Sequence, residues 1–305
     1  MAESRRADRM VSITGKIIKG IAGFYYVHDG RDTVYECKAK GAFRSEGIKP
    51  LPGDIAELDV TDAETHTGNI VRLLPRKNSL IRPASANVDS ALLVFSVKDP
   101  LPSFNLIDRL LIGYDRLGIP ASVAFSKTDL DGDESLCREY LDIYRDSGVR
   151  VAFFSTRQER GIDELLDLLD GHTTVITGPS GAGKSSLINR LAPGAGMEVG
   201  ELSRKLGRGR NTTRHTELFC IGENTFILDT PGFTSYQLDG ADKDSLKYYY
   251  REFDAYRGKC RFDDCVHIGE TSCAVKDAVS EGRISRVRYD NYRLIYGELD
   301  AARKY

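Results

Sequence analysis

The sequence lacks a long apolar run, an N-terminal export signal and an excess of charge of either sign. Its longest mainly apolar stretch, residues 91–97, is far shorter than the roughly 20 residues that a transmembrane helix needs. The first nine residues, MAESRRADR, are charged where a secretory signal would be apolar, so we expect no signal peptide. A net charge of −2 indicates no partner by itself. Binding surfaces must therefore be sought in local clusters of residues.

Cysteine is also scarce, with six in 305 residues, and without an export signal we expect free thiols. Cys37, Cys137 and Cys220 stand alone and are interpreted as small apolar residues. The other three lie with a histidine inside fourteen residues, and the candidate metal ligands are Cys260, Cys265, His267 and Cys273. Such a closed Cys₃His set suits one structural Zn²⁺ in tetrahedral geometry and leaves no position for a substrate. Incidental buried cysteines are the alternative.

The first 75 residues carry five short strand-like runs separated by turn residues: 13–18, 24–28, 33–39, 55–60 and 68–74. Five strands without a helical pattern predict a small closed β-barrel of the OB type. Such barrels bind single-stranded nucleic acid by stacking bases beside basic residues. The candidates are Phe24, Tyr25, Tyr26, Tyr35 and Phe43, with Lys16, Lys19, Lys38, Lys40 and Arg44. The plainer interpretation is that the aromatics form the core and the lysines are solvated.

Residues 76–236 alternate predicted strands and helices, which indicates a parallel α/β sheet. The predicted strands cover residues 88–96, 121–125, 149–154, 174–177 and 224–228. The predicted helices cover residues 104–117 and 135–146, where apolar residues recur at helical spacing.

The motif that organises this region is Gly178-Pro179-Ser180-Gly181-Ala182-Gly183-Lys184-Ser185-Ser186. It matches G-x-x-x-x-G-K-[ST] and lies between a predicted buried strand and a predicted helix, as a phosphate-binding P-loop requires. Backbone N–H groups of such a loop form a nest for an anion, and the next helix directs its positive N-terminal end there. We expect Lys184 to reach the β- and γ-phosphates and Ser185 to bind Mg²⁺. A chance glycine-rich turn is the alternative.

Ser126-Lys127-Thr128-Asp129 follows the predicted strand 121–125 and is similar to the N/T-K-x-D motif with which GTPases read guanine. A carboxylate such as Asp129 accepts both the N1–H and the N2–H₂ donors of guanine, a pair that adenine lacks. Lys127 is expected to lay its aliphatic stem along the base. Ser126 stands where Asn is usual, which predicts modest affinity. Ser155–Thr156 resembles the start of the S-A-K loop that also contacts guanine, and an ordinary surface turn is the alternative.

A second motif, Asp229-Thr230-Pro231-Gly232, follows the predicted strand 224–228 and fits the D-x-x-G switch of GTPases. We expect Asp229 to hold Mg²⁺ through water and the Gly232 N–H to sense the γ-phosphate. Residues 207–214 (GRGRNTTR) lie between the P-loop and this motif, and Thr212 or Thr213 is a further candidate ligand of Mg²⁺. A turn at the end of a strand is the plainer interpretation of the switch motif.

The order of these motifs is unusual, because the base-reading element precedes the P-loop, whereas ordinary GTPases place it last. The same parallel sheet can be built after joining the old chain ends and cutting elsewhere, so the arrangement resembles the circularly permuted GTPases. Phe233 also occupies the place where Ras-like proteins carry the glutamine that orients the attacking water. We therefore expect slow intrinsic hydrolysis until a partner orders the site.

Two amphipathic helices, over residues 245–253 and 285–302, are predicted to flank the metal ligands. The second is basic at its start, with Arg283, Arg286, Arg288 and Arg293. A solvated face and a face that binds RNA phosphates both fit this pattern.

The sequence thus predicts an OB-like barrel (1–75), a central, circularly permuted α/β P-loop GTPase domain (76–236) and a mostly helical zinc-binding domain (237–305). Together these resemble the ribosome small-subunit-dependent GTPase A family of bacteria over essentially the whole chain. The resemblance implies a cytoplasmic, monomeric GTPase, with GTP or GDP, Mg²⁺ and zinc bound. It would act with other assembly factors on the 30S ribosomal subunit and its 16S rRNA late in assembly, stimulated by that subunit. Members of the family often carry His where this chain has Asn211.

Three alternatives remain open at this point. A P-loop ATPase or kinase would use the same phosphate cradle but would have no use for Asp129. A non-catalytic RNA-binding module would hold nucleotide without significant turnover. The third is a permuted GTPase that acts on the large subunit, a function that the barrel and the loop of metal ligands (residues 260–273, the metal loop) fit poorly.

Overall fold

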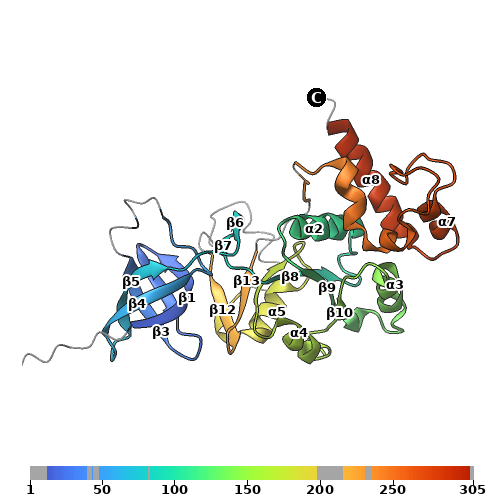
Figure 1. Ribbon diagram of the computed structural model, residues 1–305. Coiled ribbons are helices and arrows are strands. Elements are labelled where there is room, and N and C mark those ends of the chain that lie inside the picture. Colours follow the sequence, from blue (N-terminus) through green and yellow to red (C-terminus); the bar gives the residue numbers. More distant parts are fainter. Residues whose placement is uncertain are drawn as a thin grey trace, which may run out of the picture. The chain divides into compact units, whose positions relative to one another are not determined.

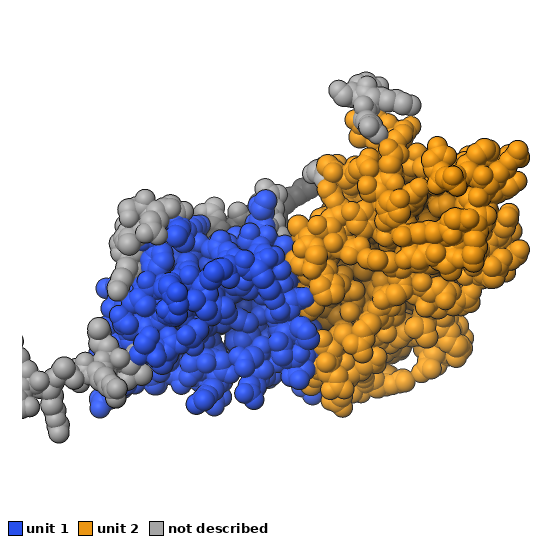
Figure 2. Space-filling model, viewed as in Figure 1, with its two compact units in different colours: residues 1–89, 169–175, 188–230 blue, residues 90–168, 176–187, 231–305 orange. Residues whose placement is uncertain are grey.

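The computed structural model describes residues 12–39, 43, 48–81, 83–197, 216–230, 235–238 and 240–302 (Figure 1). Contacts within the chain define two compact units (Figure 2). Unit 1 comprises residues 1–89, 169–175 and 188–230, and unit 2 comprises residues 90–168, 176–187 and 231–305. Each unit therefore combines segments that are far apart in the sequence.

Unit 1 contains a closed barrel with the strand order β1-β2-β3-β5-β4 (Figure 1). The strands are β1 (Ser12–Ile21), β2 (Phe24–His28), β3 (Val34–Ala39), β4 (Ile55–Asp62) and β5 (Thr67–Leu73). β3 and β5 pair in parallel, and the other pairs are antiparallel. Because side chains alternate between the two faces of a strand, the inward set forms one core, in which Ile17, Val27, Leu58 and Ile70 are fully buried. The predicted five-stranded barrel is confirmed.

Unit 1 also contains two short hairpins. β6 (Ser79–Ile81) and β7 (Ala84–Ala86) form one, which the sequence pattern does not reveal. β12 (Leu218–Gly222) and β13 (Thr225–Asp229) form the other. The turn between β12 and β13 places Asn224 in the left-handed region at φ 50°, a conformation that asparagine tolerates better than most residues. β13 therefore ends at the aspartate of the predicted switch motif.

Unit 2 contains three parallel strands, β8 (Ser90–Ser96), β9 (Ala121–Ser126) and β10 (Val151–Phe153). They are connected by α2 (Phe104–Arg116), a short 3₁₀ helix η1 (Thr128–Leu130) and α3 (Ser135–Tyr144). The chain continues through α4 (Ile162–Leu169), β11 (Thr173–Thr177), α5 (Lys184–Leu191) and the 3₁₀ helix η2 (Pro193–Ala195). The strand order of the six-stranded sheet is β10-β9-β8-β11-β13-β12. The predicted central α/β domain is confirmed, and α4 is a helix that the sequence pattern did not predict.

The C-terminal region of unit 2 contains the 3₁₀ helices η3 (Lys243–Tyr249) and η4 (Arg251–Tyr256), then α7 (Ala274–Ser280) and α8 (Arg286–Ala302). α8 agrees with its prediction to within one residue. The continuous helix predicted over 245–253 is wrong, because Tyr250 interrupts it at φ −102° and ψ 86°. The fully buried ring of Tyr250 packs on Phe253 and Tyr292, with ring centroids 5.4 and 5.2 Å away. Core packing thus outweighs the helical spacing of the apolar residues.

Helices of the described ranges are all too short or too polar to cross a bilayer.

Candidate functional site

The glycine-rich loop begins at Gly178, directly after β11, and ends where α5 starts at Lys184. Gly178 (φ 144°), Gly181 (φ 78°) and Gly183 (φ 90°) all adopt positive φ, which side chains disfavour. A Cβ atom on Gly178 would lie 2.0 Å from the carbonyl oxygen of Val94 on β8. Glycine is therefore required for the sharp turn that brings the loop against β8.

Lys184 is buried in the first turn of α5. Its Nζ donates hydrogen bonds to the carbonyl oxygens of Gly178 (2.9 Å) and Pro179 (2.8 Å). The ammonium group thus lies against the loop, where an incoming phosphate would compete with these carbonyls for it. Ser185 and Ser186 follow in the same turn and are half-buried.

Ser126 connects the base-reading segment to the P-loop. It is the last residue of β9, its side chain is buried, and its Oγ donates a hydrogen bond of 2.6 Å to the carbonyl oxygen of Ala182. The approach is close, because a Cβ atom on Gly183 would lie 3.1 Å from the same Oγ. A serine at this place, in contrast to the usual Asn, therefore spans a short gap to the loop. The two motifs that sequence reasoning assigned to opposite ends of one nucleotide are in direct contact within unit 2.

Asp129 lies in η1, and its carboxylate is held by the loop that follows β10. The hydroxyl of Ser155 donates a hydrogen bond of 2.6 Å to Oδ1, and Nη1 of Arg157 lies 3.9 Å from Oδ2. The side chain of Asp129 is only 12% exposed, whereas that of Arg157 is 84% exposed. Lys127 has positive φ (59°), and its Nζ donates a hydrogen bond to the backbone oxygen of Asp99. The N–H of Thr128 donates to the carbonyl oxygen of Phe154, in the loop after β10, at 3.3 Å. Ser155 thus lies beside the carboxylate expected to read guanine, while its own contact with the base stays a prediction.

The predicted switch residues fall partly outside the described residues. Asp229 is the last residue of β13 in unit 1, and the adjoining Thr230 is buried. Gly232, Thr212 and Thr213 lie outside the residues that the structure describes. The structure therefore brings together the P-loop and base-reading residues and leaves the switch residues as a prediction.

The four predicted metal ligands converge in the C-terminal region. The Sγ atoms of Cys260, Cys265 and Cys273 and Nδ1 of His267 all lie within 4.8 Å of one another. Nδ1 is 3.6, 3.3 and 3.4 Å from the three sulfurs in that order, and the Cys260 and Cys273 sulfurs are 3.9 Å apart. Tetrahedral Zn²⁺, with bonds of about 2.3 Å to sulfur and about 2.0 Å to nitrogen, separates its ligands by roughly 3.5–3.8 Å. Donor set and spacing therefore both fit this ion.

The thiols of this cluster are buried and close together. Burial raises the pKa of the Cys265 thiol to about 12 and raises that of Cys273 as well. Because a metal ion binds the thiolate, metal binding at this site would release these protons and would weaken as the pH falls. All six cysteines of the chain are free of disulfides. The cluster thus has the chemistry of a metal site.

α8 holds the backbone of the metal loop. The hydroxyl groups of Tyr289 and Tyr292 donate hydrogen bonds to the carbonyl oxygens of His267 (2.7 Å) and Val266 (2.5 Å). From the other side, the carboxylate of Glu270 accepts the N–H of Val266 at 2.6 Å. These contacts fix the loop from outside its ligand set, as outer-shell partners of metal sites do.

The barrel residues proposed for nucleic-acid binding divide into core and surface. Phe43 is buried, and Tyr25 and Tyr35 pack against the barrel core. Nζ of Lys19 lies 5.0 Å from the ring centroid of Tyr26, and Nζ of Lys38 lies 5.2 Å from that of Phe24. Lys16 is half-buried and bonded within unit 1: burial lowers its pKa, and its Nζ donates a 2.5 Å hydrogen bond to Oγ1 of Thr173. Lys40 and Arg44 lie outside the described residues.

The C-terminal region carries a second surface of paired cations and aromatic rings. Tyr248 is 49% exposed and contacts Lys247 and Arg257, with Nζ and Cζ 5.6 and 4.8 Å from its ring centroid. The other pairs are Lys259 and Arg283 with Tyr256, and Arg261 with Phe262. We call this set of residues the basic–aromatic surface. Rings flanked by cations match the stacking and phosphate contacts that single-stranded nucleic acid uses.

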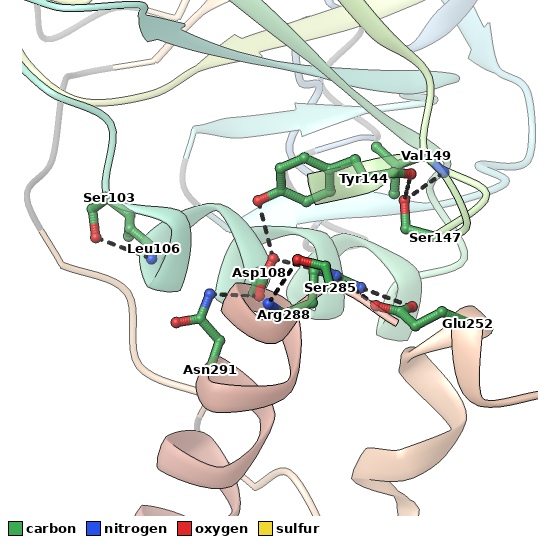
Figure 3. A network of polar contacts seen from close by, with 10 residues as sticks. All are labelled: Ser103, Leu106, Asp108, Tyr144, Ser147, Val149, Glu252, Ser285, Arg288 and Asn291. Carbon is green, nitrogen blue, oxygen red and sulfur yellow. Dashed lines mark hydrogen bonds and ion pairs between the residues drawn. The ribbon is translucent and has the colours of Figure 1, made fainter. Parts of the chain in front are cut away.

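Arg288 contradicts both interpretations of the arginines on α8. It is neither solvated nor available to RNA, because its side chain is 3% exposed and forms ion pairs with Asp108 and Glu252 (Figure 3). The signal that sequence reasoning passed over is Asp108 itself. This aspartate stands inside the apolar stripe of α2, between Ile107 and Leu110, where a carboxylate needs a buried partner.

The chain matches two family models, the RsgA N-terminal domain over residues 14–70 and the RsgA GTPase over residues 73–239. A relative from Agathobacter rectalis, described as small ribosomal subunit biogenesis GTPase RsgA, is 49% identical over 303 residues, which cover 96% of this chain and 100% of the relative. The crystal structure of YjeQ from Thermotoga maritima is 32% identical and has a TM-score of 0.77, covering 95% of this chain and 99% of that one.

The crystal structure of YloQ, described as a circularly permuted GTPase, is also 32% identical with a TM-score of 0.77, and covers 98% of this chain and 99% of that one. Similarity of sequence and of structure thus extends over the barrel, the sheet and the metal loop alike. The resemblance seen in the motifs is confirmed, and the chain belongs to the RsgA family of circularly permuted GTPases.

Proposed function

We propose that this chain is a GTP hydrolase that acts in the biogenesis of the small ribosomal subunit, binding the 30S particle and converting GTP to GDP and phosphate. The observation that carries the proposal is the hydrogen bond from Ser126 to the Ala182 carbonyl. This bond ties a segment suited to guanine to a loop suited to phosphates, which is what a single nucleotide spanning both would need. The name of the Agathobacter rectalis relative supports the ribosomal part.

At the base end, Asp129 accepts the two N–H donors on one edge of guanine. The Ser155 hydroxyl donates to its Oδ1 and thereby holds the carboxylate in one orientation. Lys127 covers the base with its aliphatic stem, while Ser126 and Thr128 fix the segment through the Ala182 carbonyl and a carbonyl after β10. The adenine of ATP lacks this pair of N–H donors and would leave the carboxylate without its partners, which argues against an ATPase or a kinase.

At the phosphate end, the loop from Gly178 to Ser186 surrounds the β- and γ-phosphates with its N–H groups. Lys184 exchanges the carbonyl oxygens of Gly178 and Pro179 for phosphate oxygens, a stronger, charge-assisted interaction. Ser185, and Asp229 through a water molecule, would hold Mg²⁺, which would neutralise charge on the phosphates. Thr212, Thr213 and Gly232 are proposed to complete this end of the site.

Water activation is proposed to depend on the ribosomal partner. Phe233 carries no hydrogen-bonding group where Ras-like proteins have glutamine, and Asn211 stands where family members often have His. The isolated chain should therefore hydrolyse GTP slowly. Binding of the 30S particle would supply or order the missing group.

We further propose that the chain has three domains with different functions. The barrel (1–75) and the zinc-bearing domain (237–305) contact 16S rRNA, and the central domain (76–236) binds GTP. The lysine–aromatic pairs of the barrel and the basic–aromatic surface support the RNA contacts. The ligand geometry around His267 supports one structural Zn²⁺. The protein would act as a monomer in the cytoplasm beside other small-subunit assembly factors.

The test is GTP and ATP hydrolysis by the full chain, alone and with purified 30S or 50S subunits. We expect slow GTP turnover, strong stimulation by 30S, and none by 50S. The Asp129→Asn variant is the control for base recognition. Equal use of ATP and GTP would favour the ATPase or kinase, turnover at background with 30S would favour a nucleotide-holding RNA-binding module, and stimulation by 50S alone would assign the chain to the large subunit.

A further inference from the structure

A buried ionic cluster joins three elements of unit 2 (Figure 3). The guanidinium of Arg288, on α8, pairs through Nη1 with Asp108 of α2. Its Nε and Nη2 donate to the two carboxylate oxygens of Glu252, on η4, at 2.8 and 3.2 Å. The side chains of Arg288, Asp108 and Glu252 are 3%, 0% and 4% exposed, and the arginine lies over the ring of Tyr250, 4.5 Å from its centroid. A charge buried so completely is held in one position.

The hydrogen-bond partners of the Asp108 carboxylate lie on α8 and α3. Besides Arg288, Asn291 of α8 donates a hydrogen bond of 2.8 Å, and the Tyr144 hydroxyl of α3 donates one of 3.2 Å (Figure 3). Burial raises the pKa of Asp108, so the arginine is needed to keep the carboxylate ionised. Removing one member of such a buried network would leave an uncompensated charge, which is strongly unfavourable, so its members are held together. The cluster thus fixes α2 relative to α8.

The same helix α8 also holds the metal loop. Tyr289, the residue after Arg288, and Tyr292, one helical turn further along α8, donate to the carbonyl oxygens of His267 and Val266. The position of α8, and therefore of Arg288, is coupled to the conformation of the metal loop.

The other end of α2 contacts the nucleotide site. Tyr114 and Thr177 share a hydrogen bond between their side chains, and Thr177 immediately precedes the P-loop glycine Gly178. Tyr236, four residues after the D-x-x-G motif, packs on α2 so closely that a Cβ atom on Gly113 would lie 2.6 Å from its hydroxyl oxygen. Glycine inside a helix is unfavourable, so this close approach explains its presence. α2 thus touches the segments adjoining both phosphate-binding motifs.

We propose that Arg288 is a positioning residue for the nucleotide site: through α2, it couples the metal loop to the P-loop and to the segment after the switch motif. A macromolecule docked on the metal loop would move α8, and α2 would change how tightly the P-loop holds nucleotide. This inference rests on the proposed function only in taking the P-loop as a GDP- and GTP-binding site. It assigns the C-terminal region a role in nucleotide retention besides docking.

The test measures the dissociation rate of a fluorescent GDP analogue from the full-length, zinc-loaded chain. In Arg288→Met, a residue of similar length without charge, we expect GDP to dissociate at least about fivefold faster. Arg286→Met is the matched control, because Arg286 is 69% exposed on the same helix and pairs only with Asp290 at 3.2 Å among the described residues. It should leave the rate unchanged, and both variants should retain the zinc content of the wild type.

A double-mutant cycle with Tyr114→Phe, which removes only the hydroxyl at the far end of α2, separates coupling from local damage. If both residues act on one path, Tyr114→Phe alone accelerates release and adds little to Arg288→Met. Should Arg288→Met fail to fold, removal of zinc by a chelator must accelerate GDP release in the wild type and not in Tyr114→Phe.

An unchanged rate of GDP release in Arg288→Met overturns the coupling. It is also overturned if the effects of Arg288→Met and Tyr114→Phe on that rate are additive. Neither result contradicts the nucleotide site itself. A wild-type chain that binds no GDP overturns the proposed function and the coupling together.

Discussion

Replacing Ser126 by alanine should weaken guanine-nucleotide binding, because it removes the bond that ties β9 to the P-loop. Both partners are interior, with Ser126 2% and Ala182 0% exposed, so water cannot replace the lost donor. An unsatisfied buried carbonyl costs about 1–3 kcal/mol. If the whole cost falls on the conformation that binds nucleotide, the dissociation constant rises about five- to 150-fold, since about 1.4 kcal/mol corresponds to a factor of ten.

The assay is titration of GDP and GTP by calorimetry, with thermal unfolding of the nucleotide-free chain in parallel. Ser122→Ala is the matched control, because Ser122 is half-buried on the same strand. A fall in melting temperature alone would mean that the bond stabilises the fold without organising the site. Unchanged affinity and unchanged melting temperature would refute the reasoning altogether.

Three further substitutions test the base, the loop and the metal. Asp129→Asn should lower GTP affinity about tenfold or more and leave ATP binding unaffected, as measured by competition binding. An amide has one acceptor oxygen, whereas guanine presents two N–H donors that a carboxylate can accept. Gly178→Ala should abolish nucleotide binding and lower the melting temperature, because its Cβ would lie 2.0 Å from a carbonyl oxygen of β8. Gly118→Ala, with positive φ and open space, is its control. Cys265→Ser should reduce bound zinc, measured by elemental analysis, whereas Cys137→Ser should not.

Each of these has an outcome that contradicts it. Undiminished GTP preference in Asp129→Asn would remove the base-reading assignment. Equal effects of Gly178→Ala and Gly118→Ala would show that backbone strain, and not the contact with β8, matters. Full zinc content in Cys265→Ser would mean that the ligand set is wrong.

Features whose causes are local could be predicted from the sequence. The barrel strands follow from period-two runs ended by turn residues, and the P-loop from a fixed pattern of glycines and one lysine. The metal ligands follow from the grouping of Cys260, Cys265, His267 and Cys273, whose spacing needs no knowledge of the fold. α8 follows from its helical periodicity over four turns.

Features decided by long-range packing could not be predicted in this way. Tyr250 breaks the helix expected over 245–253 because its ring belongs in a core built by Phe253 and by Tyr292 of α8. Arg288 looks like a surface arginine until its partner Asp108, far away along the chain, is placed beside it. The role of Ser126, at a position where Asn is usual, likewise becomes clear only once the Ala182 carbonyl that accepts its hydrogen bond is known. In each case at least one deciding neighbour, namely Tyr292, Asp108 or Ala182, lies far away along the chain.

The strand order of the barrel also bears on how the chain emerges during synthesis. β5 is the last strand made and lies between β3 and β4, so the barrel cannot close before Leu73 has been added. Once β5 has left the ribosome, every barrel strand can pair on both sides and the small core can be completed. The closed barrel itself then presents no strand edge to which another nascent chain could add, while the rest of the protein is still being translated.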